Sequence, residues 1–277
     1  MKRLKFAIIG KPLSHSLSPV LHNYWFKKYN IEANYELMEI EEAQIKKTIE
    51  LIKKKEIKGI NVTLPYKKAV IPFLSKIIND AEQTHSVNTI LLDENDNLIG
   101  ENTDVFGFQA GYLQTFVNQE KNNTKALILG AGGVSPSIIL ALKKLKITNI
   151  YLSNRTFEKS LFLKQKFKNL NLIKWEEYPK YINGFDIIIN ATSLGLNKDQ
   201  DFKINFKEPK KNLVYVDTIY NPQQTNMIKY FKSKNIKTFN GLDMFIYQGQ
   251  KAFFLWNKIN PEVDDNLIKL LESKLNK

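Results

Sequence analysis

The fold of this 277-residue chain is decided by the stretch Ala126-Leu127-Ile128-Leu129-Gly130-Ala131-Gly132-Gly133-Val134-Ser135-Pro136. Its first four residues are apolar and predict a buried strand, and helical patterning resumes at Ser137. The first glycine permits a tight turn, and the second lets backbone approach a pyrophosphate at the helix N-terminus. Ser135 replaces the third glycine of this fingerprint and is small enough for close packing. The stretch therefore predicts a dinucleotide-binding domain of the Rossmann type.

The end of the next predicted strand, residues 150–153, indicates which dinucleotide binds. A domain that binds NAD has an acidic residue there, about 20 residues after the glycine turn, to bind the ribose 2′-hydroxyl. This chain continues instead with Asn154-Arg155-Thr156, and Lys159 follows one helical turn later. A guanidinium, a hydroxyl and an ammonium suit a 2′-phosphate. The sequence therefore predicts NADP as the cofactor.

Short apolar runs alternate with amphipathic segments along the chain, which is typical of an α/β fold with mostly parallel sheets. The strands are predicted at residues 5–9, 35–38, 59–63, 89–92, 98–100, 126–129, 150–153, 186–190, 214–217 and 236–238. The helices are predicted at residues 18–29 (with Ser18 as N-cap), 41–55, 67–74, 104–118, 137–146, 158–168, 225–234, 244–258 and 263–275.

The order of these segments predicts two domains. Residues 1–104 and 242–277 would form an N-terminal α/β domain that carries the substrate site, and residues 105–241 the Rossmann domain. The last two helices follow the second sheet in sequence. We therefore expect them to return to the first domain.

Composition excludes several classes of protein. The chain has no cysteine, which excludes disulfides, thiolate zinc sites and a cysteine nucleophile. His15, His22 and His85 lack the spacing of metal ligands, so we assign no metal. The apolar run at residues 6–9 is too short for a secretory signal, and no run approaches the roughly 20 apolar residues of a membrane span. We expect a cytoplasmic protein that does not contact membranes.

The formal net charge of +13 raises the question of nucleic-acid binding. Only Arg3 and Arg155 are arginines, and the other 39 basic residues are lysines spread along the chain. Proteins that read nucleic acids usually employ arginine for bidentate contacts. We interpret the lysines as solvated residues on helix surfaces and expect no nucleic-acid partner.

Polar clusters follow the strands of the first predicted domain. They are Ser14-His15-Ser16-Leu17-Ser18-Pro19, Asn61-Val62-Thr63-Leu64-Pro65-Tyr66-Lys67, Ser86-Val87-Asn88-Thr89 and Glu101-Asn102-Thr103-Asp104. Strand alternation places Asn61 and Thr63 on the same side, with Lys67 about one turn beyond. Hydroxyls and amides with one lysine and one carboxylate suit a small polyhydroxylated substrate.

These motifs resemble the shikimate dehydrogenase family. The motifs are S-x-S-P, N-V-T-x-P-x-K, V-N-T, N-T-D, G-A-G-G, N-R-T and a late G-L-x-M-x-x-x-Q. They run in the family's order from Ser16 to Gln248, so the resemblance covers nearly the whole chain. It implies reversible reduction of 3-dehydroshikimate to shikimate with NADPH, in the pathway to chorismate and the aromatic amino acids. Two departures are Val105-Phe106, where many relatives have glycine after N-T-D, and Lys159, where arginine is common. The second implies a less absolute preference for NADP.

The resemblance also implies roles for single residues. Lys67 and Asp104 would be the catalytic pair, in which Lys67 gives a proton to the alkoxide that hydride transfer creates and Asp104 orients it. The substrate would contact Ser16 and Ser18 through its carboxylate, and Asn61, Thr63, Lys67, Asn88, Asp104, Tyr220 and Gln248 around its ring. The cofactor would contact Gly130, Ala131, Gly132, Gly133, Val134, Asn154, Arg155, Thr156, Lys159, Thr192 and Gly241.

Alternatives to these roles stay open at this point. Ser18 and Asp104 could cap helices, and Asn61 and Thr63 could simply end a strand. The chain could also be a quinate/shikimate dehydrogenase with looser cofactor choice, a non-catalytic NADP-binding relative, or a basic nucleic-acid-binding protein. The missing acid near Asn154 argues against the first and the intact Lys67 and Asp104 against the second. We expect a small-molecule partner only, and a monomer or homodimer.

Overall fold

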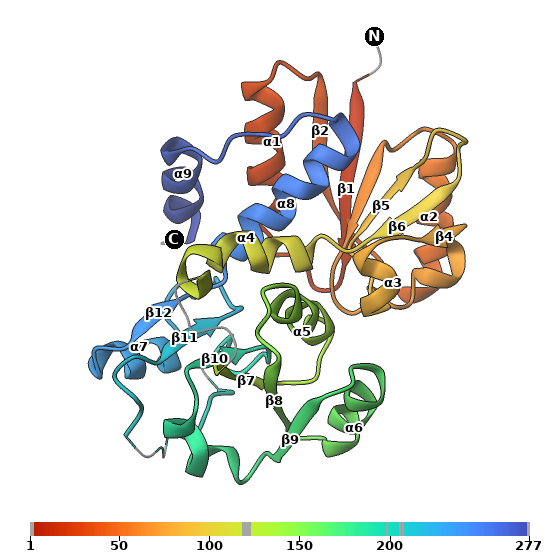
Figure 1. The fold of residues 1–277 in the computed structure, drawn as a ribbon. Helices are drawn as coiled ribbons and strands as arrows, with labels where there is room; N and C mark the ends of the chain where they lie inside the picture. The colour runs from red at the N-terminus through yellow and green to blue at the C-terminus, as the bar shows by residue number, and fades with distance from the viewer. Residues whose placement is uncertain (1–2, 118–122, 198, 205, 207, 276–277) are drawn as a thin grey trace. The chain divides into compact units, whose positions relative to one another are not determined.

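The computed structural model describes residues 3–117, 123–197, 199–204, 206 and 208–275 (Figure 1). The chain forms two compact units, of which unit 1 comprises Met1–Gly107 and Ile246–Lys277 and unit 2 comprises Phe108–Phe245. Each unit has its own six-stranded sheet with helices packed on it. The predicted α/β class is therefore confirmed, and the C-terminal helices belong to unit 1 as expected.

The sheet of unit 1 is mixed. Its strands are β1 (Leu4–Gly10), β2 (Ala33–Glu39), β3 (Gly59–Val62), β4 (Lys76–Ile77), β5 (Thr89–Leu92) and β6 (Leu98–Glu101), in the order β2-β1-β3-β5-β6-β4. Strand β1 is parallel to β2 and β3, whereas β5 is antiparallel to β3 and β6. The start of β5 therefore lies at the same edge as the end of β3, and Asn61 pairs with Thr89. This pairing brings two of the polar clusters together.

Several helices belong wholly or partly to unit 1. They are α1 (Ser18–Lys28), α2 (Ile45–Lys53), α3 (Asp80–Thr84), α4 (Asp104–Val117), α8 (Leu242–Asn257) and α9 (Asp265–Leu275), with the short 3-10 helices Glu42–Gln44 and Ile71–Phe73. The isoleucines of α2 pack into a core with Ala7, Ile9 and Ile60. The predicted end of α4, Asn118, lies outside the described residues.

Aromatic rings fill the other face of this sheet, because Phe6 alternates with Ala7 along β1. The Phe6 ring lies 5.0 Å from Phe26 of α1 and 5.1 Å from Trp256 of α8. Figure 1 shows α8, in blue, beside α1. The Trp256 indole donates to the carbonyl of Ile90 at 3.2 Å, and a Cβ on Gly59 would lie 2.2 Å from its Nε1. The returning helix thus packs directly against the backbone of the sheet.

The sheet of unit 2 is entirely parallel. Its strands are β7 (Lys125–Leu129), β8 (Asn149–Asn154), β9 (Leu170–Lys174), β10 (Ile187–Asn190), β11 (Val214–Asp217) and β12 (Lys237–Phe239), in the order β12-β11-β10-β7-β8-β9. The remaining elements are α5 (Ser135–Lys144), α6 (Phe157–Lys166), α7 (Asn226–Ser233) and the 3-10 helix Tyr178–Gly184. This is the doubly wound order of dinucleotide-binding domains, which bind ligands at the carboxyl ends of the strands, where the order reverses.

Three local predictions are corrected by the structure. Residues 67–74, predicted as a helix, form turns and the short 3-10 helix, because Pro72 restricts the backbone before it. Ser18 is not an N-cap, since the cap position is Leu17 and the backbone N–H of Ser18 donates to Ser16 Oγ at 3.3 Å. The backbone N–H groups of Asp104 and Val105 donate to Asn102 Oδ1. Asn102, and not Asp104, therefore caps the start of α4.

No helix in the described part of the chain is both long enough and apolar enough to span a bilayer.

Candidate active site

Lys67 and Asp104 form a buried ion pair in unit 1. Lys67 lies in the turns after β3, Asp104 begins α4, and Lys67 Nζ is 2.6 Å from Asp104 Oδ2. Only 13% of the lysine side chain and 7% of the aspartate side chain are exposed. The other carboxylate oxygen, Oδ1, accepts from Asn88 Nδ2 at 2.8 Å. Both oxygens of Asp104 therefore have a donor, and its carboxylate holds the lysine ammonium in one place.

The amide of Asn88 is itself fixed by its neighbours. Its Nδ2 also donates to Thr103 Oγ1 at 3.0 Å, and its Oδ1 accepts from the Thr103 backbone N–H at 2.8 Å. The hydroxyl of Thr89 donates to the same Oδ1 at 3.1 Å. Asn88 can therefore present Nδ2 to Asp104 in one orientation only.

Asn61 connects this group to the start of the chain. Its Nδ2 donates to the Asn88 carbonyl at 3.0 Å and to Thr89 Oγ1 at 3.1 Å, and its Oδ1 accepts from the Tyr35 hydroxyl at 2.7 Å. Burial raises the pKa of Tyr35 well above its usual value, and the nearby Ser18 hydroxyl opposes this rise. Ser16 Oγ donates to Ser18 Oγ at 3.2 Å.

These contacts bring eight polar residues into one group, which we call the serine–lysine network. Ser16 and Ser18, which bond each other, adjoin Tyr35, and the Ser18 hydroxyl opposes the rise in the pKa of Tyr35. From Tyr35, hydrogen bonds run through Asn61, Thr89, Asn88 and Asp104 to Lys67. Six of these residues were predicted from the sequence as site residues. Tyr35 and Thr89 were not, although Thr89 stands within one of the quoted motifs.

Thr63 and Gln248 are the two other predicted substrate residues of unit 1. Thr63 follows β3, and its backbone N–H donates to the Ile9 carbonyl at 2.9 Å. Its half-buried side chain makes no hydrogen bond to the network within the described part of the chain. Gln248 is half-buried on α8. Both side chains belong to the same unit as the network.

The glycine turn of unit 2 has the geometry that its sequence predicts. Gly130 has φ +112°, and a Cβ there would lie 2.8 Å from the Ala191 carbonyl oxygen. A Cβ on Gly132 would meet nothing nearer than 3.9 Å, so that side of the turn is open. Ser135 begins α5 and donates from Oγ to the Gly130 carbonyl at 2.9 Å. The turn therefore offers open backbone beside a helix N-terminus, which suits a pyrophosphate.

The end of β8 carries cations and no carboxylate. Asn154 accepts from the Ala131 N–H at 3.0 Å and donates to the Thr156 carbonyl at 2.7 Å, so it ties this strand end to the glycine turn. Arg155, Thr156 and Lys159 are exposed around the start of α6. Within the described residues, neither cation has a carboxylate partner. Both side chains are available to a 2′-phosphate.

Three further connections of unit 2 carry predicted residues. The backbone N–H and hydroxyl of Thr192 donate to Asn190 Oδ1 at 2.9 and 2.7 Å. The Gly241 N–H donates to the Ile219 carbonyl at 2.9 Å, and the Tyr220 ring lies 4.9 Å from Phe245. Thr192 follows β10, Tyr220 follows β11 and Gly241 follows β12, and all three lie at the same end of the parallel sheet as the glycine turn.

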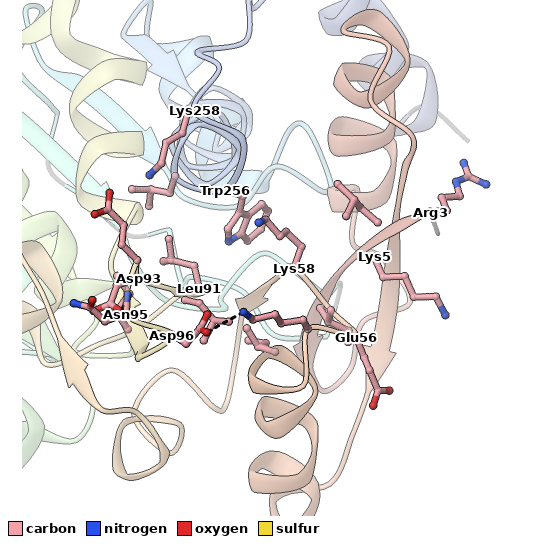
Figure 2. A pocket seen from close by; sticks show the side chains of 18 residues that line it. Arg3, Lys5, Glu56, Lys58, Leu91, Asp93, Asn95, Asp96, Trp256 and Lys258 are labelled. Carbon is pink, nitrogen blue, oxygen red and sulfur yellow. Dashed lines mark hydrogen bonds and ion pairs between the residues drawn. The ribbon is translucent and has the colours of Figure 1, made fainter. Parts of the chain in front are cut away.

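A cavity of about 770 Å³ in unit 1 lies away from all of these residues (Figure 2). It is lined by the start of β1 and the end of β5, which is the opposite sheet edge from the network. Its charged lining is mixed, and comprises the basic residues Arg3, Lys5, Lys55, Lys58 and Lys258 and the acidic residues Glu56, Asp93, Glu94 and Asp96. None of the predicted site residues lines it.

The sheet order and glycine turn of unit 2, with a buried lysine–carboxylate pair in unit 1, define a dinucleotide-dependent oxidoreductase. Comparison with family models narrows this class. The model for the shikimate dehydrogenase substrate binding domain matches residues 8–90, and the model for shikimate / quinate 5-dehydrogenase matches residues 113–242. The chain belongs to the shikimate dehydrogenase family, as its motifs indicated.

Individual relatives match over nearly the full length. The shikimate dehydrogenase (NADP(+)) of Pelagibacter ubique is 49% identical over 267 residues, which are 96% of this chain and 98% of that protein. The crystal structure of the Aquifex aeolicus shikimate dehydrogenase is 34% identical, with a TM-score of 0.85 over 100% of this chain and 98% of that one. The Thermus thermophilus shikimate 5-dehydrogenase, solved with NADP(H) and shikimate, is 28% identical, with a TM-score of 0.84 over 99% and 98%.

Proposed function

We propose that this protein is an NADP-dependent shikimate dehydrogenase, which reversibly reduces 3-dehydroshikimate to shikimate on the route to chorismate and the aromatic amino acids. The observation that carries the proposal is the buried Lys67–Asp104 pair, fixed by the serine–lysine network. The names of the relatives from Pelagibacter ubique and Aquifex aeolicus support the same activity.

The residues of unit 2 fit NADP. The open side of Gly132 and the start of α5 suit the pyrophosphate, and the exposed Arg155 and Lys159 suit a 2′-phosphate. Strand β8 ends at the amide Asn154, where a domain that binds NAD has an acidic residue. The bound cofactor supplies the hydride.

Lys67 is proposed to hold the proton that the substrate oxygen receives during reduction. An ammonium has three N–H donors, and among the described residues only Asp104 accepts from Lys67. Two donors therefore remain for a ligand. In the reverse direction the neutral amine takes the hydroxyl proton, and Asp104 keeps Nζ in place in both directions.

The substrate carboxylate and ring hydroxyls are assigned to separate parts of the site. Ser16 and Ser18 are proposed to bind the carboxylate, and Thr63, Gln248 and Tyr220 to contact the ring. Asn61 and Asn88 have used their amide hydrogens within the network. Their proposed contribution is therefore one of orientation, together with the acceptor capacity left on Asn61 Oδ1, which among the described residues accepts only from Tyr35.

The proposal also covers the cellular location, the oligomeric state and the partners of the enzyme. We infer that it acts in the cytoplasm as a monomer or homodimer, with small molecules as its partners. Light scattering after size exclusion measures the oligomeric state.

The decisive experiment follows the absorbance of reduced nicotinamide when the protein is mixed with NADPH and 3-dehydroshikimate. Oxidation of NADPH that depends on both protein and substrate is expected. No turnover overturns the proposal. A parallel assay in the oxidative direction pairs quinate or shikimate with NAD or NADP. Efficient use of quinate with NAD would instead identify a quinate/shikimate dehydrogenase.

A further inference from the structure

We propose that Asp217 and Asn190 are positioning residues that hold two loops of unit 2 in register to receive the nicotinamide half of NADP. The inference rests on the proposed function for the identity of the cofactor. It concerns residues at the carboxyl ends of β11 and β10 that the motif comparison does not assign to the site.

Asp217 is a fully buried carboxylate with four hydrogen-bond donors. Its Oδ2 accepts from the Tyr215 hydroxyl at 3.0 Å and from Thr225 Oγ1 at 2.8 Å. Its Oδ1 accepts from Asn190 Nδ2 and from the Ile219 N–H, both at 3.0 Å. One Oδ1 donor is the last residue of β10 and the other lies in the loop after β11. One oxygen atom therefore joins the end of β10 to the start of the loop after β11.

The Asp217 side chain is an ionised carboxylate at neutral pH. Burial raises its pKa to about 6, and its four hydrogen bonds oppose that rise. It is therefore ionised at neutral pH, without a cationic partner among the described residues. A buried charge held only by hydrogen bonds is costly and demands its donors in defined positions. Such a group is well suited to fixing loop geometry.

Asn190 connects Asp217 to the loop that follows β10 and carries Thr192. It pairs with Asp217 in the parallel register of β10 and β11. Its Nδ2 bonds Asp217 and the Leu194 carbonyl, and its Oδ1 accepts both the N–H and the hydroxyl of Thr192. All the hydrogen-bonding capacity of the amide is used. The position of Thr192, a predicted cofactor residue, thus depends on the position of Asp217.

The loop that follows β11 and carries Tyr220 is fixed by hydrogen bonds at both the N–H and the carbonyl of Ile219. Asp217 accepts the N–H of Ile219, and the carbonyl of Ile219 accepts the N–H of Gly241. A Cβ on Gly241 would lie 2.1 Å from the Thr218 carbonyl oxygen, so only glycine permits this approach. Tyr220 follows directly in the chain, and its backbone is therefore set by the same contacts.

The strand order indicates which half of the cofactor meets these loops. The order β11-β10-β7-β8 places the 2′-phosphate residues at the end of β8 and the pyrophosphate turn at the end of β7. A dinucleotide that lies along this edge has its adenosine over β8 and its pyrophosphate at β7. Its other half then lies over β10 and β11. Asp217 should consequently affect the nicotinamide half and leave the adenosine half unaffected.

The test uses Asp217→Asn in the full-length protein, with Asp186→Asn as the matched control. Asp186 precedes β10 at the opposite sheet edge, where it accepts from the Lys125 N–H and from Lys210 Nζ. Calorimetry measures the binding of NADPH and of adenosine 2′,5′-bisphosphate, which lacks the nicotinamide half. In D217N the Kd for NADPH should rise at least about tenfold, the effect of one lost charge-assisted hydrogen bond. Binding of the bisphosphate should be unchanged, and D186N should match the wild type for both ligands.

Two results overturn the proposal. One is unchanged NADPH binding by folded D217N, and the other is equal weakening of both ligands, which indicates a general disturbance of the domain. If D217N does not fold, Asn190→Ala provides the same test, because it removes the amide between Asp217 and Thr192. These readouts need no turnover. A wild type that binds NADPH but does not oxidise it with 3-dehydroshikimate overturns the proposed function and leaves this inference standing.

Discussion

Asp104 is held by two donors, whereas Lys67 has one acceptor. Lys67 Nζ lies 2.6 Å from Asp104 Oδ2, and Asn88 Nδ2 lies 2.8 Å from Asp104 Oδ1. The carboxylate is therefore fixed by its own neighbours, and the ammonium keeps two N–H groups without an acceptor among the described residues. This asymmetry suits a group that must reach a ligand while its orienting partner stays in place.

Lys67→Ala should remove most turnover and leave shikimate binding nearly unchanged. General acid–base groups contribute about 10²- to 10⁴-fold to rates, so kcat should fall by this factor. Steady-state kinetics with calorimetric binding of shikimate measures both effects. The control is Lys47→Ala, which removes an exposed lysine of α2. Turnover that persists in the Lys67 variant shows that another group supplies the proton.

Tyr35→Phe should weaken both the protein and its substrate site. The change keeps the ring and removes the hydroxyl that donates to Asn61 Oδ1. An unsatisfied buried acceptor costs about 1–3 kcal/mol of unfolding free energy. The KM for shikimate should rise, while NADPH binding is unchanged. Tyr24→Phe, which loses hydrogen bonds to Asp264, should affect stability without the change in KM. Equal effects of the two variants on KM would contradict the role of the network.

Arg155→Ala should reduce the use of NADPH far more than that of NADH. A charge-assisted hydrogen bond contributes about 1.5–3 kcal/mol, so the KM for NADPH should rise roughly tenfold or more. NADH has no 2′-phosphate and should be almost unaffected. Kinetics with both cofactors gives the ratio, and the exposed lysine change Lys164→Ala in α6 serves as control. A parallel loss for both cofactors would place Arg155 outside the 2′-phosphate site.

His22→Phe should make the protein less sensitive to acid. Burial lowers the pKa of His22 to about 3, and neither ring nitrogen has a partner among the described residues. In the unfolded chain the pKa is about 6.5. Between these values the unfolded state binds one more proton, so the stabilising contribution is present above pH 6.5 and is lost as the pH falls towards 3. The loss reaches about 1.4 kcal/mol per pH unit in that range.

The measurement for this variant is the free energy of unfolding by urea between pH 4 and pH 7. The phenyl ring preserves stacking on Tyr35, which lies 4.4 Å from the His22 ring. His15→Gln changes an exposed histidine and should keep the wild-type slope. If the slope of the His22 variant also equals that of the wild type, His22 is protonated in the folded protein.

The predictable part of the fold is the part with strong local patterns. The apolar strand before Gly130 and the helix after it specify the Rossmann unit without reference to the rest of the chain. Strand β9, in contrast, was missed. It is the outermost strand of its sheet, and Asn171 and Lys174 interrupt its apolar pattern. The two-residue strand β4 exists only through its pairing with β6, and no local pattern indicates it.

Some residues of the candidate site could be predicted from the sequence, and others could not. Motifs identified Lys67, Asp104 and Asn88, which are polar residues in short clusters between predicted elements. Tyr35 was missed because a tyrosine in a strand is most simply interpreted as core. Its contact with Asn61 depends on β1 lying between β2 and β3, which only the folded sheet reveals. The contact between Asp217 and Asn190 was likewise hidden, since 27 residues separate these two side chains, which are register neighbours in the folded sheet.

The contact of Trp256 with Gly59 has a consequence for the order of synthesis. Unit 1 needs α8 to cover Phe6 and to supply the indole donor to Ile90, and α8 is translated after every strand of unit 2. Domains generally fold during translation from the N-terminus onwards. In this chain all residues of unit 2 are synthesised before unit 1 is complete. We therefore expect the aromatic face of the unit 1 sheet to stay uncovered until α8 and α9 have been synthesised.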